Sequence, residues 1–349
     1  MKDLFEVKQV DIECYQKNIR DFLPPKIVDI HTHVYVNNDA VSDRSLDSRL
    51  VSWTTKVANQ NPVEDLFETY RLMFPDKVVI PLMFAHPRYA EDINTVNQYI
   101  LDGSQEGKAY GLLLSKPEWT PTRFEDALLS GDYKGAKFYL NFSPAYIPRK
   151  EIRIYDFLPP AHLEVLNKHG RIAMLHIPRD GRLKDPVNLA QMMEIEERYP
   201  KVKLIIAHVG RAYSREDVGD AFEVLASTKN MLFDFSANTN EWVFEQLLKA
   251  VGPKRILFGS DLPITRMRMR RITEKGIYVN IVPKGLYGNV SDDPHMREVE
   301  GFEGEKLTFF LYEEILAFKK AAVAAKLTKE EVEDVFYNNG MNLLSAIGK

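Results

Sequence analysis

The chain has 349 residues, 45% of them hydrophobic and 28% charged, and its formal net charge is −4. This profile is typical of a globular protein with a large core, and the slightly acidic balance gives no support for binding to nucleic acid or to a membrane surface. The single cysteine, Cys14, excludes a disulfide framework and a thiolate metal cluster. No apolar run approaches a membrane span and the first residues lack a signal-peptide pattern, so we expect a cytoplasmic protein.

Eight short apolar segments recur along the chain, and each is followed by a pattern typical of a helix. They span residues 26–34, 77–84, 109–115, 133–140, 171–178, 201–209, 231–237 and 255–261. Near-continuous apolar strands of this kind are typical of a parallel sheet covered on both faces. The alternation predicts a single (β/α)8 TIM barrel domain over residues 1–349. A doubly wound open sheet is the alternative, but the G-x-G-x-x-G motif is absent after the first strand.

Three of the expected helices carry a capping pattern, a hydroxyl residue followed three positions later by an acidic one. The pairs are Thr122 with Glu125, Ser214 with Asp217, and Thr328 with Glu331.

Three segments go beyond a minimal barrel: a leader at 1–25, an excursion at 35–76 after the first strand, and another at 262–305 after the eighth. The last contains "GIYVNIVPKGLYG", which resembles a hairpin. Both excursions leave the carboxyl ends of strands, where barrel active sites lie. We therefore expect both to form lid or specificity loops over the active-site face.

Two histidines stand one residue apart inside the first strand, in "KIVDIHTHVYV". Residues i and i+2 of a strand point to the same side, so both His31 and His33 can face the barrel interior. Taken alone, the pair is more simply interpreted as two hydrogen-bonded histidines. However, His176, His208 and Asp261 fall at the ends of the fifth, sixth and eighth strands. Imidazoles and a carboxylate converging on one point indicate a divalent cation.

These motifs resemble the amidohydrolase superfamily, in particular its amidohydrolase-related branch of lactonases, hydratases and decarboxylases of the aminocarboxymuconate-semialdehyde type. The resemblance lies in "VDIHTHV", "MLHIPR", "IIAHVGR", "RILFGSDLP" and the terminal "VFYNNGMNLL", and it spans about residues 26–345. It implies that His31, His33 and His176 are metal ligands. It further implies that Asp261 is a ligand or the general base beside the metal, and that His208 contacts the metal-bound water or a substrate oxygen.

Lys137 leaves the number of metal ions open. It lies in "GAKFYL", at a position where some superfamily members carry a carboxylated lysine between two metals. We favour one divalent ion, zinc, with manganese or another divalent metal as alternatives, and Lys137 as a substrate-carboxylate binder. A second metal held through Lys137, or a lysine that simply extends from the barrel rim, are the other interpretations.

Two arginines follow the strand-end histidines directly. Arg179 in "HIPRD" and Arg211 in "HVGRAY" could each bind a carboxylate through two hydrogen bonds, and structural ion pairing is the equal alternative. Further candidates for substrate contact lie at or beyond strand ends: His86, Tyr139 and Asn238.

The sequence therefore predicts a metal-dependent hydrolase that acts on a C–O or C–N bond of a small, anionic substrate through a metal-activated water. A metal-dependent decarboxylase or hydratase with the same ligands is the alternative, because fold and ligands do not decide the reaction. A metal-dependent nuclease and a non-catalytic metal-binding protein are less favoured. We expect no nucleic-acid partner and no membrane, and a homo-oligomer is compatible with the sequence.

Overall fold

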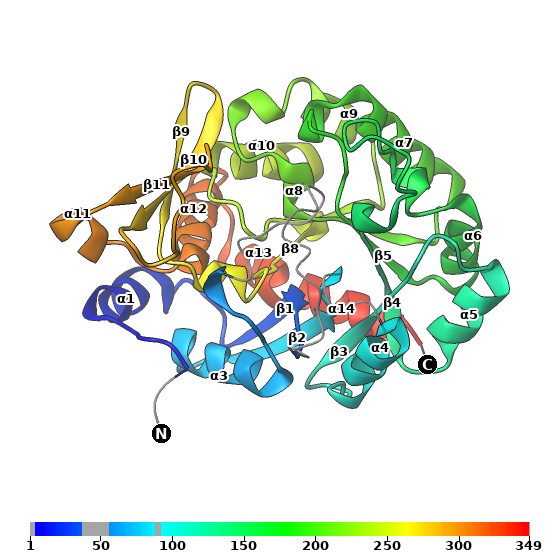
Figure 1. Ribbon diagram of the computed structural model, residues 1–349, viewed down its shortest axis with the longest axis horizontal. Helices are drawn as coiled ribbons and strands as arrows, with labels where there is room; N and C mark the ends of the chain where they lie inside the picture. Colours follow the sequence, from blue (N-terminus) through cyan, green and yellow to red (C-terminus); the bar gives the residue numbers. More distant parts are fainter. Residues whose placement is uncertain (1–3, 37–55, 88–91, 349) are drawn as a thin grey trace.

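The computed structural model describes residues 4–36, 56–87 and 92–348 and shows eight parallel strands, each paired with the next in chain order. Figure 1 shows the strands near the centre of the molecule, with helices at its periphery. This arrangement confirms the predicted (β/α)8 barrel. The strands are β1 (Lys26–His33), β2 (Val78–Phe84), β3 (Tyr110–Leu114), β4 (Tyr133–Phe138), β5 (Ile172–Leu175), β6 (Lys203–Ile206), β7 (Leu232–Asp234) and β8 (Ile256–Leu257).

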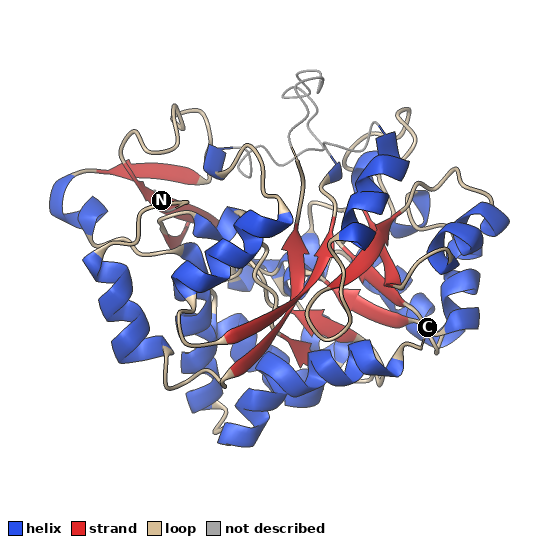
Figure 2. Ribbon diagram, turned by 90° about the horizontal axis from the view of Figure 1, so that it is seen from below, coloured by secondary structure: helices blue, strands red, loops and turns tan. Residues whose placement is uncertain are grey.

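Helices connect successive strands and pack around the barrel (Figure 2). They are α3 (Val63–Met73), α4 (Ile93–Asp102), α5 (Pro121–Leu129), α6 (Pro160–His169), α7 (Pro186–Arg198), α8 (His208–Arg211), α9 (Ala221–Leu225) and α10 (Glu241–Val251). A further helix, α12 (Phe310–Ala324), comes after the last strand of the barrel. The chain ends with α13 (Lys329–Glu333) and α14 (Asn339–Ala346), separated by a π-helical turn. This terminal segment binds β8, since Phe258 N donates to Val335 O and Asn339 Nδ2 donates to Ile256 O.

Irregular backbone hydrogen bonds between β1 and the segment after β8 close the barrel. Ile30 N donates to Phe258 O at 2.9 Å, and Asp261 N donates to His31 O at 2.7 Å. The buried carboxylate of Asp29 supports the same seam, because it accepts hydrogen bonds from Ser260 N at 2.8 Å and Ser260 Oγ at 2.5 Å. Closure therefore places Asp261 directly beside the H-x-H segment.

The last strands are shorter than the sequence pattern predicts. Regular pairing in β8 covers only Ile256–Leu257 of the expected 255–261, and β6 ends at Ile206, before His208. The apolar run continues past each strand because the following residues remain buried, so hydrophobicity alone does not mark where pairing stops.

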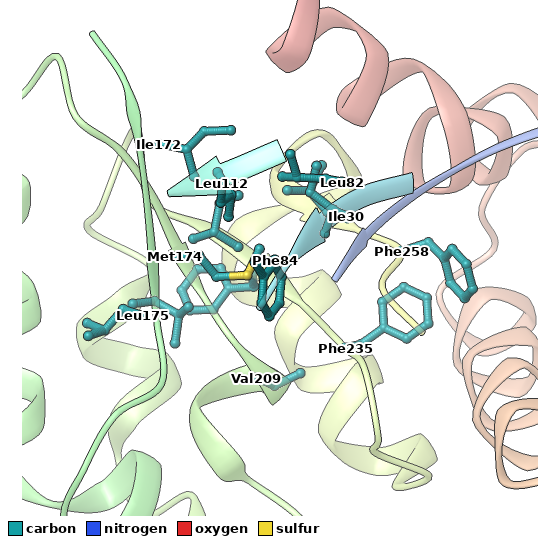
Figure 3. Packing of buried hydrophobic residues seen from close by; sticks show 14 of the residues in the cluster. Ile30, Leu82, Phe84, Leu112, Ile172, Met174, Leu175, Val209, Phe235 and Phe258 are labelled. Carbon is teal, nitrogen blue, oxygen red and sulfur yellow. The ribbon is translucent and has the colours of Figure 1, made fainter. Parts of the chain in front are cut away.

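Side chains from separate strands fill the core, as Figure 3 shows for Ile30, Leu82, Leu112 and Met174. All four are fully buried. Burial of a side chain of this size stabilises the fold by about 1.5–3 kcal/mol.

The excursion after β8 forms a separate three-stranded sheet beside the barrel: β9 (Arg270–Glu274), β10 (Ile277–Pro283) and β11 (Met296–Val299), followed by α11 (Gly301–Glu305). The predicted hairpin within "GIYVNIVPKGLYG" is wrong in detail. That stretch supplies only β10, whose antiparallel partner is the preceding β9 and whose other neighbour, β11, runs parallel to it. Residues 37–55 of the first excursion lie outside the described residues.

The leader packs beside this sheet through α1 (Gln9–Cys14). Buried Asp11 accepts hydrogen bonds from Arg268 Nη1 at 2.9 Å and Arg268 Nη2 at 2.5 Å. This contact joins residues far apart in sequence and fixes the segment that leaves the end of β8.

One predicted capping pattern is confirmed, one is displaced and one caps a shorter element. Thr328 Oγ1 accepts a hydrogen bond from Glu331 N at the start of α13. Thr120, not Thr122, caps α5, because Pro121 occupies the first helical position. Ser214 begins a short 3₁₀ turn rather than a long helix. Among the described residues no helix has both the length and the apolar character needed to cross a membrane.

Candidate metal centre

Strand ends on one rim of the barrel bring together the five residues expected at the metal site. His31 and His33 come from β1, His176 follows β5, His208 follows β6 and Asp261 follows β8. The ring centroids of His31 and His208 lie 4.8 Å apart, those of His31 and His33 5.6 Å apart, and those of His176 and His208 5.3 Å apart.

A buried carboxylate fixes the orientation of His31. Its Nδ1 lies 2.9 Å from Asp234 Oδ2, and a carboxylate only accepts hydrogen bonds, so Nδ1 carries the proton. With the proton on Nδ1, the other ring nitrogen, Nε2, is left to bind a cation. That atom is buried, has no hydrogen-bond partner among the described residues, and lies 3.5 Å from Asp261 Oδ1.

The tautomer of His33 follows from Tyr139. The Tyr139 hydroxyl donates to the carbonyl of Ala85 at 3.1 Å, so its oxygen is left to accept from His33 Nδ1 at 3.3 Å. His33 Nε2 then faces Asp261 Oδ1 at 3.0 Å. Two acceptors at this distance repel each other unless a cation or a proton lies between them.

His208 is held the same way from the next strands. Its Nδ1 lies 2.9 Å from Ser236 O and so donates to that carbonyl, while its backbone N donates to Asp234 Oδ1 at 2.9 Å. The residues from His208 to Arg211 all have φ between 51° and 61°, in the left-handed region. This conformation costs roughly 1–2 kcal/mol for each residue other than glycine, and such strain is concentrated at functional sites.

Burial favours the neutral form of three of these imidazoles. It lowers the pKa of His33 and of His176 well below the usual value, and it lowers the pKa of His208 to about 4. The neutral ring is the form that binds a metal ion, so no proton needs to be displaced near pH 7.

These donors fit a divalent cation. One ligand atom from each of His31, His208 and Asp261 lies within 4.8 Å of the other two, and His33 shares the same Asp261 oxygen as His31. Donors bound at about 2.1 Å from one ion lie at most about 4.2 Å apart, so this cluster needs only small side-chain shifts to hold an ion. His176 lies one ring further away, against His208, and no described residue forms a hydrogen bond with its buried Nδ1.

Lys137 on β4 is also buried in this region. Its Nζ lies 5.0 Å from the ring centroid of Phe84 and 5.2 Å from that of Tyr139, and no described carboxylate forms an ion pair with it. Burial lowers the pKa of Lys137 to about 8, although Asp234 and Asp261 oppose the shift. A lysine in this setting is a charge available to an anionic ligand.

The two arginines differ in the partners they have. Arg179 Nε is bound to Asp185 at 3.0 and 3.1 Å, which gives it a structural ion pair. Arg211 Nη1 contacts only backbone carbonyls, the shortest at 3.1 Å from Arg179 O, and its positive charge helps to lower the pKa of His176. Arg211 is therefore the arginine beside the site with no carboxylate partner among the described residues.

The remaining candidates for substrate contact, His86 and Asn238, also differ in their surroundings. His86 lies next to His33, with ring centroids 5.5 Å apart. Asn238 is fully buried, and its side-chain amide bonds to backbone groups: it donates to Ala212 O and accepts from Asn240 N. Its contacts give no support to the expected role in substrate binding.

Two residues of the site were not found from the sequence, Asp234 and Ser236. Asp234 Oδ2 accepts a hydrogen bond from His31, and Asp234 Oδ1 accepts three others. The backbone carbonyl of Ser236 accepts the hydrogen bond from His208 Nδ1. The available signal was a lone acidic residue inside the apolar run "MLFDFSA", which alone does not distinguish a structural from a functional role. Gly259 was missed as well: a Cβ there would lie 2.6 Å from His31 Cβ.

Comparison with known families identifies the family of this chain. The amidohydrolase family model Amidohydro_2 matches residues 28–345, nearly the whole chain. The chain belongs to this amidohydrolase family. No curated protein sequence shows significant similarity to it.

Solved structures with the same fold share little sequence with this amidohydrolase. A protein from Acinetobacter baumannii named as a probable 2-pyrone-4,6-dicarboxylic acid hydrolase, with citric acid bound, is 14% identical with a TM-score of 0.54, covering 91% of this chain and 99% of that one. A dihydroxybenzoic acid decarboxylase from Polaromonas sp. JS666, with manganese and 2-nitroresorcinol bound, is 13% identical with a TM-score of 0.55, covering 93% and 98%. An amidohydrolase from Burkholderia multivorans with bound zinc is 12% identical with a TM-score of 0.54, covering 91% and 99%.

Proposed function

We propose that this amidohydrolase is a divalent-metal-dependent hydrolase that uses a metal-activated water on a C–O or C–N bond of a small, carboxylate-bearing lactone, ester or amide. One observation carries the proposal. The Nδ1 atoms of His31, His33 and His208 are each engaged with an acceptor, so three Nε2 lone pairs remain for the region that Asp261 occupies.

We assign the metal ion to His31, His33 and Asp261, with His208 as the fourth donor that the geometry favours over His176. Imidazole nitrogen with one carboxylate suits zinc, and manganese is the second candidate. A bound ion of this kind polarises a carbonyl oxygen and lowers the pKa of water to about 7. Lys137 is kept for the substrate in this assignment, so one ion is expected per chain.

Asp261 is the proposed general base. Its Oδ1 faces His31 and His33, whereas no described residue hydrogen-bonds its Oδ2. Its side chain is 14% exposed, so a small molecule at the barrel mouth can reach it. A carboxylate in this position can take a proton from the attacking water and return it to the leaving group.

Arg211 and Lys137 are the proposed binding groups for a substrate carboxylate, because each is a cation beside the site without a carboxylate partner among the described residues. Charge-assisted contacts of this kind orient a substrate as well as bind it. The Acinetobacter and Polaromonas neighbours carry names of carboxylate-bearing substrates, which accords with this proposal.

A panel of lactones, esters and amides, each of which also carries a free carboxylate, tests the reaction. We expect turnover by zinc- or manganese-loaded enzyme, loss of turnover after chelation, and recovery when metal is returned. Asp261→Asn should lower kcat by about 10²–10⁴, the usual contribution of a positioned base. Full activity in Asp261→Asn would remove Asp261 from the chemistry.

A decarboxylase is the second candidate, and Lys137 is the observation that favours it. A buried ammonium over the rings of Phe84 and Tyr139 could hold the carboxylate that leaves, or protonate the carbanion that remains. Release of carbon dioxide from aromatic and dienoic acids, with no hydrolysis of the first panel, would replace the hydrolase proposal by this one.

A further inference from the structure

A cavity separate from the metal centre lies between the leader and the segment that follows β8. Its volume is about 250 Å³, and it is lined by residues of the leader, by 56–57, Arg266, Arg268, 286–287 and Phe309. Leu4, Phe5, Val57, Leu286 and Phe309 give it apolar walls.

Arg266 contributes a positive charge to this cavity. Its side chain is buried, with only 8% of the residue exposed. Nη2 donates to Asn61 Oδ1 and to the Asp65 carbonyl, whereas Nε has no hydrogen-bond partner in the part of the chain that the structure describes. Burial lowers the pKa of its guanidinium to about 10, although the charge of Asp65 opposes the shift, and within the described ranges no carboxylate comes close enough to Arg266 to form an ion pair. A buried cation without a counter-ion is costly, which points to an anion that is brought by a ligand.

Arg268 lines the same cavity and provides the contrast. Its guanidinium is bound by the carboxylate of Asp11, so its charge is already balanced. Its backbone N–H donates to the hydroxyl of Tyr287 at 2.6 Å, which leaves the Tyr287 proton free to be donated. Arg266 and Tyr287 therefore form a pair of donors inside apolar walls.

We propose that this cavity binds a small carboxylate with an apolar body about the size of one aromatic ring. The carboxylate would bind Arg266 and Tyr287, and the ring would contact the apolar walls. Among lining residues Glu6 is the only acid, while Lys8 and Lys56 add positive charge. The apolar walls disfavour inorganic phosphate, which would lose hydration on all sides.

The cavity is distinct from the metal centre but lies close to it. Asn61 stands between the two, because its Oδ1 accepts from Arg266 and its Nδ2 donates to His33 O at 2.6 Å. A ligand on Arg266 is thus one side chain away from the backbone of a proposed metal-binding residue.

Titration calorimetry of the full-length, metal-free protein with benzoate tests the proposal. We expect one saturable site with a Kd of about 1 mM or tighter. Benzyl alcohol, which lacks the charge, and inorganic phosphate, which lacks the ring, should bind at least about tenfold more weakly. Absence of saturable benzoate binding, or equal binding of benzyl alcohol, would overturn the proposal.

Variants locate the binding site. Arg266→Met should abolish binding, but its burial can also affect folding, so the main test is at half-exposed Leu286. Leu286→Glu should weaken benzoate binding about tenfold or more, whereas Leu286→Gln, of the same shape, should change it less than about threefold. Arg211→Met, at the barrel mouth, should leave binding unchanged. Loss of binding in Arg211→Met with no effect of Leu286→Glu would place benzoate at the barrel mouth and refute the cavity site.

Discussion

Asp234→Asn tests the proposed orientation of His31 without changing the shape of the site. Asp234 Oδ1 accepts from His208 N at 2.9 Å, Ser236 N at 3.1 Å and Ser236 Oγ at 2.5 Å. Two of these donors are backbone N–H groups, so the amide oxygen of asparagine must take this position. The amide nitrogen then faces His31 Nδ1 and donates to it. His31 would carry its proton on Nε2, toward the metal centre.

The magnitude follows from the hydrogen bond that metal binding would then break. To bind a cation through Nε2, the variant must return the proton to Nδ1, which places an N–H against the amide N–H₂. Losing that bond and leaving the donor buried costs about 1–3 kcal/mol. The expected loss of metal affinity is therefore about 10–100-fold, the range usual for groups that orient a ligating histidine.

Competition with a zinc chelator measures the affinity, and Asp29→Asn is the matched control. Asp29 is an equally buried carboxylate on β1, but it binds Ser260, the Tyr70 hydroxyl and the His31 backbone N, and no imidazole. Asp29→Asn should lower the free energy of unfolding while changing metal affinity less than about threefold. Equal metal affinities of wild type and Asp234→Asn, or equal losses in both variants, would refute the tautomer argument.

Three further outcomes follow from the geometry. His208→Asn should release more metal than His176→Asn, measured as metal per chain after dialysis, and the reverse order would make His176 the fourth ligand. Arg211→Met should raise KM for a carboxylate substrate about 10–100-fold, whereas Arg179→Met should lower only the melting temperature, since Asp185 already binds it. Lys137→Met should stabilise the metal-free protein by about 3 kcal/mol at pH 7, because burial lowers the pKa of Lys137 from 10.5 to about 8. The unfolded chain binds that proton more tightly, so the gain should shrink as pH rises from 8 to 10.5 in denaturant titrations, and a constant gain would contradict the shift.

The barrel, and the rim of it on which the candidate metal ligands gather, were predictable because both depend on short-range pattern. Apolar runs identify strands, and the period of two places His31 and His33 on one side. Parallel strands then bring the ends of β5, β6 and β8 to the same rim, which is why single histidines far apart in sequence meet.

The contacts that set the chemistry of each side chain could not be predicted in the same way. Arg179 and Arg211 occupy equivalent places after a strand-end histidine, yet only Arg179 meets an aspartate in its own loop. Asp234 binds His31 across 203 positions of sequence. Such partners depend on loop geometry and on the register between strands, neither of which hydrophobic periodicity encodes.

The strand ends illustrate the same limit. The apolar run at 255–261 continues past the regular pairing of β8 into residues that bond irregularly to β1. Ile30 N donates to Phe258 O, and Asp261 N donates to His31 O. Likewise, the turn of left-handed backbone from His208 to Arg211 contains only one glycine, Gly210, so the sequence gives little indication of it.

Metal content per chain tests the central claim most directly. Wild-type protein incubated with zinc or manganese and dialysed should retain close to one ion per chain, and His31→Asn with His33→Asn should retain none while remaining folded by circular dichroism. A wild-type protein that retains no ion would contradict the account, and a value near two would bring Lys137 into direct contact with metal.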